Sequence, residues 1–212
     1  MSTTNVAAAF QATQLAFTTD GETETTFSDN AVPGIGTAGR AALEEEGISN
    51  AAQVVGWFLR VNGDRARFGE FLIKNGCHAA SVNRAEVGTV ATVADKCSSY
   101  VLEEADDAPA AVDVAAGTTQ VARNFEAKQP SFADTFDSNP VPGLGAVGRE
   151  RLINSGYHIT NAAQLVGHFM ILNGDEEMFL GFLTGEECGV QARHAQTVLR
   201  AISDKVAPFC SA

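Results

Sequence analysis

The sequence contains little cysteine, four residues in a chain of 212. Four thiols are too sparse for a disulfide scaffold in a chain of this length, and none belongs to a Cys-x-x-Cys pair of the kind that binds zinc or performs redox chemistry. No apolar run approaches the roughly 18 to 20 residues of a membrane span, and the first residues lack the basic and apolar regions of a secretion signal. We therefore expect an intracellular protein, nuclear or cytoplasmic, that does not insert into membranes.

Basic residues are also scarce, with 14 Lys and Arg against 26 Asp and Glu and a formal net charge of −12. This balance excludes a protein that is held to nucleic acid by bulk electrostatics, so any contact with nucleic acid must be local. The hydrophobic share of 45% and the charged share of 19% are ordinary for a globular protein. They exclude disorder, collagen and coiled coil as descriptions of the whole chain.

The chain is a tandem repeat of two copies, called copy one and copy two below. Three segments of copy one return in copy two in the same order: TTNVAAAFQATQLAF (3–17) as TTQVARNFEAKQPSF (118–132), VPGIGTAGRAAL (32–43) as VPGLGAVGRERL (141–152), and NAAQVVGWFLRVNGD (50–64) as NAAQLVGHFMILNGD (161–175). Between the copies, a segment with five acidic residues and no basic one is typical of an extended, solvated linker. We expect a first domain over residues 1–102, an acidic linker over 103–117 and a second domain over 118–212.

Apolar residues recur at helical spacing within each copy and never alternate cleanly. The sequence therefore predicts an all-α fold with five helices per copy. In copy one the helices are predicted to begin near Thr3, at the turn after Pro33, at Asn50, at Asp64 and near Val82. Asn50 is a typical N-cap residue, because its side chain can accept a hydrogen bond from a free backbone amide of the first turn.

The strongest chemical signal is a Pro-Gly-hydrophobic-Gly turn before the second helix of each copy, at residues 33–36 and 142–145. Its glycines let the backbone take positive φ and lie close to a ligand. The amides after the second glycine are unpaired donors at a positive helix end, so they can bind a phosphate oxygen without a basic side chain. A tight turn between helices, with no ligand, is the alternative. The candidate phosphate-binding residues are Gly34, Ile35, Gly36, Thr37 and Ala38 in copy one and Gly143, Leu144, Gly145, Ala146 and Val147 in copy two.

These turns and the motifs that follow them resemble barrier-to-autointegration factor, a family with a helix-hairpin-helix motif. After the hairpin come a leucine and glutamate stretch, then VVGWFL, then an aspartate and a Phe-x-x-x-Leu helix that leads to a cysteine. The resemblance covers residues 32–96 and 141–205. It implies a compact five-helix chromatin protein that binds double-stranded DNA without sequence preference, forms symmetric dimers that bridge two duplexes, and holds LEM-domain proteins in the dimer groove.

The resemblance also implies roles for three arginines and for the third helix. The basic residue that the family places before its last helix corresponds to Arg193, and less directly to Arg84, while Arg149 lies one step before a position where the family has lysine. The resemblance places the family's dimer face on the third helix. We therefore expect the copies to dock as an intramolecular pseudo-dimer, with a LEM-domain-like or other protein partner in the groove between them. The candidate contact residues are Gly56, Trp57, Gly167 and His168. The alternative is that Trp57 is a packed core aromatic residue and that His168 is a partly exposed polar residue.

No set of residues indicates catalysis, because neither a Ser-His-Asp set, a Cys-His set nor a carboxylate pair is repeated. Cys77 with His78, and Cys188 with His194, give two potential metal ligands per copy at inconsistent spacing, fewer than a tetrahedral site needs. We expect a non-enzymatic protein with no cofactor and no metal. The alternative to DNA binding is a structural or scaffolding module that keeps the fold, which the missing lysines and the acidic linker favour.

Overall fold

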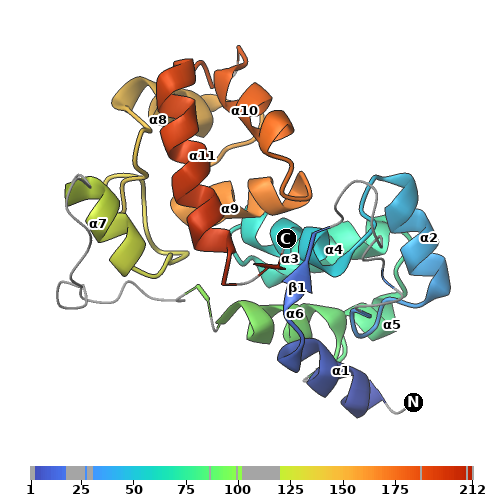
Figure 1. Ribbon diagram of the computed structural model, residues 1–212. Helices are drawn as coiled ribbons and strands as arrows, with labels where there is room; N and C mark the ends of the chain where they lie inside the picture. The colour runs from blue at the N-terminus through green and yellow to red at the C-terminus, as the bar shows by residue number, and fades with distance from the viewer. Residues whose placement is uncertain are drawn as a thin grey trace.

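The computed structural model describes residues 3–17, 27, 31–85, 87–98, 100–101, 120–186, 188–208 and 210–211. Over these residues the chain is helical apart from two short strands, which confirms the predicted all-α class (Figure 1). The predicted acidic linker over 103–117 lies outside the described residues.

The described helices and strands follow the order of the repeat. Copy one contains α1 (Thr3–Ala12), β1 (Leu15–Ala16), α2 (Thr37–Glu45), α3 (Ala51–Arg60), α4 (Arg65–Lys74), α5 (Ala79–Val82) and α6 (Thr89–Ser98). Copy two contains α7 (Gln120–Ala127), α8 (Ala146–Asn154), α9 (Ala162–Ile171), α10 (Glu176–Thr184), α11 (Ala192–Val206) and β2 (Cys210–Ser211).

Two of the predicted helix starts are fixed by capping side chains. The Asn50 side chain accepts a hydrogen bond from the amide of Gln53 (2.9 Å) at the start of α3, and Asp64 accepts from the amides of Ala66 and Arg67 (both 3.0 Å) at the start of α4. Such caps satisfy amides that have no partner inside the helix, and each contributes about 1 kcal/mol. The predicted starts at Asn50 and Asp64 are therefore confirmed.

The last helix of copy one begins later than predicted. We expected it near Val82, but Val82 ends the short α5, and α6 begins at Thr89. A Cβ atom at Gly88 would lie 2.6 Å from the backbone nitrogen of Arg84, so the chain folds back tightly on itself here. Copy two has the uninterrupted α11 of 15 residues in the corresponding place.

A lysine on the last helix of each copy holds the first helix. The Lys96 ammonium is buried and donates to the carbonyls of Phe10 (2.8 Å) and Thr13 (2.7 Å) at the end of α1. Lys205 donates to the carbonyls of Glu126 (2.8 Å) and Lys128 (2.9 Å) at the end of α7. Burial lowers the pKa of Lys96, and it lowers the pKa of Lys205 to about 8. Both cations satisfy helix-end carbonyls, so neither is free to bind an anion.

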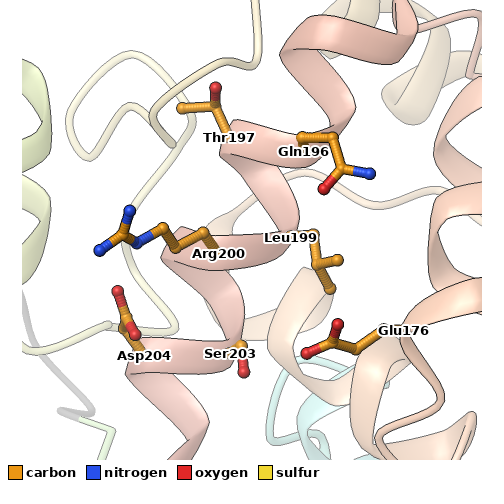
Figure 2. Close-up of a pocket in the computed structure, with 7 residues that line it drawn as sticks. All are labelled: Glu176, Gln196, Thr197, Leu199, Arg200, Ser203 and Asp204. Atoms are coloured by element: carbon orange, nitrogen blue, oxygen red, sulfur yellow. The ribbon is translucent and has the colours of Figure 1, made fainter.

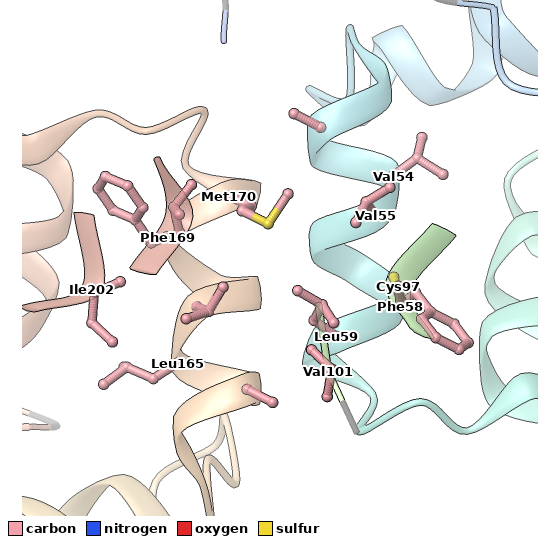
Figure 3. Packing of buried hydrophobic residues seen from close by; sticks show 14 of the residues in the cluster. Val54, Val55, Phe58, Leu59, Cys97, Val101, Leu165, Phe169, Met170 and Ile202 are labelled. Atoms are coloured by element: carbon pink, nitrogen blue, oxygen red, sulfur yellow. The ribbon is translucent and has the colours of Figure 1, made fainter. Parts of the chain in front are cut away.

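The two copies meet along α3 and α9, whose backbones come unusually close. A Cβ atom at Gly56 would lie 2.8 Å from the carbonyl oxygen of Gly167, and a Cβ atom at Gly167 would lie 2.6 Å from the carbonyl oxygen of Gly56. Figure 3 shows the side chains of α3, among them Leu59, and of α9, among them Met170, in the layer between the two helices. Only glycine permits this approach, because any side chain would separate the helices.

The hydrogen bonds between the copies come in equivalent pairs. Gln53 donates to the carbonyl of Ile171 (3.0 Å), and its counterpart Gln164 donates to the carbonyl of Arg60 (3.2 Å). An Asn–Asn bond of 2.7 Å also forms on each side, between Asn50 and Asn173 and between Asn161 and Asn62. A contact in which equivalent residues exchange roles is the kind that relates two subunits by a two-fold axis.

A segment near the start of each copy reaches across to the other copy. The Phe17 ring covers Gly174 and packs edge-on against Phe169, with ring centroids 5.9 Å apart. The Phe132 ring covers Gly63 and packs edge-on against Phe58, with centroids 6.0 Å apart. On the side of Phe17, β1 of copy one pairs in parallel with β2 of copy two. The cores of the two copies are thus completed by each other's segments.

Candidate nucleic-acid interface

The first glycine of each hairpin (residues 33–36 and 142–145) is required by the turn itself. Gly34 and Gly143 have φ values of +83° and +82°, which L side chains rarely adopt. A Cβ atom at Gly34 would collide with the Thr89 hydroxyl, and one at Gly143 would lie 2.6 Å from the carbonyl oxygen of His194. Each hairpin therefore lies directly against the last helix of its own copy.

The apolar residue of each hairpin fixes the turn in the core. Ile35 and Leu144 are buried, with 3% and 4% of their surface exposed, so only their backbone can face a ligand. In copy one the Thr89 hydroxyl also donates to the carbonyl of Pro33 (2.8 Å), which ties the hairpin to the start of α6. The buried side chain in each copy, and this hydrogen bond in copy one, fix the position of the hairpin against the core.

The second glycine of each hairpin stands in open space. Gly36 and Gly145 have ordinary φ values of −80° and −72°, and no atom lies within 4 Å of a Cβ atom built on either. Both are N-cap residues without a capping side chain. The first helical residues after them, Thr37 and Ala38 in copy one and Ala146 and Val147 in copy two, are exposed. Helix amides at such an end carry a partial positive charge and can bind an anion.

Two of the three predicted arginines lie beside the hairpins. Arg193 is exposed in the first turn of α11, next to His194, whose carbonyl oxygen contacts Gly143. Arg84 is exposed in the loop before α6, and its backbone contacts Gly88, which precedes Thr89. The structure thus brings one exposed arginine near each hairpin.

Arg149, which we expected to be available for DNA, is engaged within the protein. Its guanidinium is half-buried and forms an ion pair with Asp137 (2.7 Å) and a hydrogen bond to the carbonyl of Phe136 (3.2 Å). Asp137 neutralises this charge, so Arg149 attaches α8 to the segment before the hairpin. A contact between Arg149 and DNA stays a prediction, and this ion pair weakens it.

The predicted contact residues of the third helix divide into two kinds. Gly56 and Gly167 touch across the copies, as described above. Trp57 instead stacks on Phe71 of its own copy, with centroids 4.2 Å apart, and His168 packs on Phe182 of its own copy at 4.0 Å. Trp57 and His168 are therefore next to the contact between the copies, and their rings pack within their own copies.

One cluster of side chains beside this contact combines residues of both copies. Arg60 of copy one lies over the Tyr157 ring of copy two, with the guanidinium carbon 5.6 Å from the ring centroid. The Tyr157 ring packs edge-on against His168 at 5.1 Å. Burial, with a smaller contribution from Arg60, lowers the pKa of His168 to about 4. His168 is therefore neutral at physiological pH.

Sequence reasoning missed the residues that cross between the copies. Phe17 and Phe132 match in the repeat although both lie outside the described helices, and Asn62 and Asn173 precede identical glycines. These residues are identical in the two copies although they lie outside the helices. Surface loops usually vary, so this identity was the signal in the sequence that these residues make contacts.

The geometry defines a pair of helical domains, each with a hairpin that packs against the last helix and is followed by an exposed helix end with no capping side chain. A family model described as barrier to autointegration factor matches residues 27–103 and 118–209, so the chain belongs to this family and contains two tandem copies of its domain. No curated protein and no solved structure matches the chain. The family is a non-enzymatic DNA-binding family, and membership suggests DNA binding or bridging.

No group of three or more His, Cys, Asp or Glu side chains that could hold a metal ion occurs among the residues that the structure describes. None of the helices that the structure describes has both the length and the apolar character needed to span a bilayer.

Proposed function

We propose that the chain binds the backbone of double-stranded DNA without sequence preference, through the amides of its two hairpins. The observation that carries this proposal is the open space over Gly36 and Gly145, at helix ends that no side chain caps. A phosphate oxygen at each helix end would meet exposed backbone donors. Base edges play no part in such a contact, so it carries no sequence information.

The same geometry explains how an acidic chain could hold a polyanion. Helix-end amides supply positive potential without a net charge, and Arg84 and Arg193 add one exposed cation near each hairpin. Lys96 and Lys205 are engaged with carbonyls inside the protein and add nothing to this surface. Attraction to DNA would be confined to two small areas.

Bridging of two duplexes is supported by the separation of the hairpins. Figure 1 shows α2 and α8, which the hairpins precede, at opposite ends of the molecule with α3 and α9 between them. Each copy would hold its own duplex, and the close contact at Gly56 and Gly167 would hold the two duplexes together. The chain would then do alone what the family does as a dimer of two chains.

A protein-binding role is the second candidate, and one observation favours it. Tyr157 is 38% exposed beside Arg60 and Phe182, so aromatic surface lies next to the contact between the copies. Tyrosine, tryptophan and arginine are the residues that most often anchor protein interfaces. A LEM-domain-like partner could dock there with or without DNA, so this role is separable from the hairpins.

The hairpins are tested with glutamate at the open glycines. In Gly36→Glu and Gly145→Glu the new side chain has room, so the free energy of unfolding, measured by thermal denaturation, should stay within about 1 kcal/mol of that of the parent. It also adds negative charge where phosphate would lie. With a random-sequence duplex at low salt, fluorescence anisotropy should show weaker binding in each variant, the larger loss in Gly145→Glu, and no binding in the double variant.

Gly156→Glu is the matched control. Gly156 follows the far end of α8, and a Cβ atom built on it also meets no atom within 4 Å, so this variant adds the same charge away from the hairpin. Binding by the control should stay within about twofold of the parent, since one exposed charge contributes little at a distance. If the double variant binds DNA as well as the control does, the hairpins are only turns. Two differently labelled duplexes should come together with the parent and stay apart with either single hairpin variant.

A further inference from the structure

A line of polar residues runs along α11 from the hairpin of copy two. Arg193, Thr197 and Arg200 recur at spacings of four and three residues and are all exposed. Helix geometry places Arg193 and Arg200 two turns apart, about 10.5 Å along the axis and about 20° apart around it. These three residues are called the α11 edge below.

The α11 edge begins at the hairpin itself. A Cβ atom at Gly143 would lie 2.8 Å from the Cβ atom of Thr197, so Thr197 is packed beside the turn. A phosphate bound by the amides after Gly145 would therefore have the α11 edge as its neighbour.

The surface along α11 is hollowed as well as polar. A hollow of about 640 Å³ is lined by Glu176, Gln196, Thr197, Leu199, Arg200, Ser203 and Asp204. Figure 2 shows Thr197, Arg200 and Asp204 along one side of α11, with Gln196, Leu199 and Glu176 toward the other. An extended chain could lie along the side that carries Thr197 and Arg200.

The charged residues along the hollow limit the stretch of surface that could bind a polyanion. Arg200 has no ion pair within the part of the chain that the structure describes, whereas the guanidinium of Arg149 is taken by Asp137. One turn beyond Arg200 stands the exposed Asp204, and Glu176 lies across the hollow. Carboxylates repel phosphate, so the stretch that suits a polyanion runs from the hairpin to Arg200 and stops there.

We propose that the α11 edge binds the sugar–phosphate strand that continues from the phosphate at the hairpin of copy two. This inference rests on the proposed function and extends it to a longer binding site. The Thr197 hydroxyl, which donates a long hydrogen bond to the carbonyl of Arg193 (3.4 Å), turns to donate to a phosphate oxygen, and Arg200 binds a further phosphate beyond the one near Arg193. Because Arg200 lies about 10.5 Å beyond Arg193 along α11, the two guanidinium groups would contact different phosphates.

Copy one cannot form the same extended site. Counting back from the equivalent lysines Lys205 and Lys96, the counterpart of Thr197 is Gly88 and the counterpart of Arg200 is Ala91. Neither can bind phosphate through its side chain. The longer site therefore belongs to copy two alone and makes the two DNA sites unequal.

The test uses the full chain with Gly36→Glu, so that binding reports on copy two. In this chain Arg200→Ala introduces alanine, the residue that copy one has at the equivalent position. Arg67→Ala is the control, because it also removes one positive charge but from the exposed surface of α4. Anisotropy with a random-sequence duplex is measured over a salt series. Arg200→Ala should weaken binding about five- to tenfold at low salt and reduce the slope of log affinity on log salt by about 0.9, the value for one phosphate contact. Arg67→Ala should change affinity less than about twofold and leave the slope unchanged.

Two further variants complete the test. Thr197→Val should weaken binding about two- to fivefold without changing the slope, because it removes a neutral donor. Asp204→Asn should strengthen binding, since it removes a repelling charge at the end of the edge. If Arg200→Ala binds like Arg67→Ala, the α11 edge is overturned while the hairpin proposal stands, provided that Gly145→Glu still abolishes binding. If Gly145→Glu has no effect, the proposed function itself fails.

Discussion

The closest contact between the copies predicts a large effect of one added methyl group. In Gly167→Ala the new Cβ atom would lie 2.6 Å from the carbonyl oxygen of Gly56 and 2.6 Å from the backbone nitrogen of Arg60, whereas ordinary contact begins near 3.4 Å. Backbone atoms cannot rotate away as a side chain does. The helices α3 and α9 must therefore separate by about 0.8 Å at this point.

That separation breaks the hydrogen bonds that cross the contact. Gln53 and Gln164 reach carbonyls at 3.0 and 3.2 Å, so both of these bonds would stretch beyond bonding distance. The two Asn–Asn bonds of 2.7 Å would lengthen to about 3.5 Å, the outer limit for a hydrogen bond, and would be weakened. At about 1 kcal/mol for each broken bond and about half of that for each weakened one, about 3 kcal/mol is lost. Alanine returns about 1 kcal/mol through its higher helix propensity. We expect Gly167→Ala to lower the free energy of unfolding by about 2 kcal/mol.

Gly181→Ala is the control, because it makes the same change in α10, where no atom lies within 4 Å of the new Cβ atom. Helix propensity alone predicts a gain of about 1 kcal/mol there. Denaturant unfolding followed by circular dichroism would measure both variants, and small-angle scattering would show whether Gly167→Ala enlarges the molecule. Gly167→Ala as stable as the control would refute the close approach of α3 and α9.

Two further predictions concern buried titratable groups. His168 has a folded-state pKa of about 4 against its ordinary value of 6.5, so the unfolded chain takes up a proton that the folded chain refuses. Stability should fall as pH drops from about 6.5 to 4, by at most about 3 kcal/mol, and His168→Gln should remove this part of the pH dependence in denaturant titrations at several pH values. Lys96→Met should leave the carbonyls of Phe10 and Thr13 unpaired and cost about 3 kcal/mol. Hydrogen exchange should then be faster in α1, and unchanged protection of α1 would contradict the role assigned to Lys96.

Features of the fold that depend on neighbouring residues could be predicted from the sequence. Asn50 and Asp64 cap helices through amides two or three residues away, so their signal is local. The apolar residues of the hairpins, Ile35 and Leu144, are buried, and their apolar character is itself a local signal. The hairpin positions followed from the same local pattern.

Features that depend on distant residues could not be predicted. Phe132 contacts Gly63, far away in the other copy, and no spacing rule connects them. The partner of Arg149 is Asp137, and the sequence does not indicate that this arginine turns toward a carboxylate. The open space over Gly145 and the crowded space at Gly143 also depend on where α11 packs, so the two glycines of one hairpin look alike until the fold is known.

The joining of two copies in one chain has a consequence for symmetry. In a dimer of identical subunits every substitution occurs twice, so two identical sites must change together. Here Arg60 faces Tyr157 on one side only, and Arg200 in copy two stands where copy one has alanine. Because the two copies lie in one chain, a residue of one copy can differ from its counterpart in the other, while the glycines and asparagines of the shared contact are the same in both. Under the proposed function such a chain can keep hold of one duplex while it exchanges the other, a division of labour that two identical sites cannot provide.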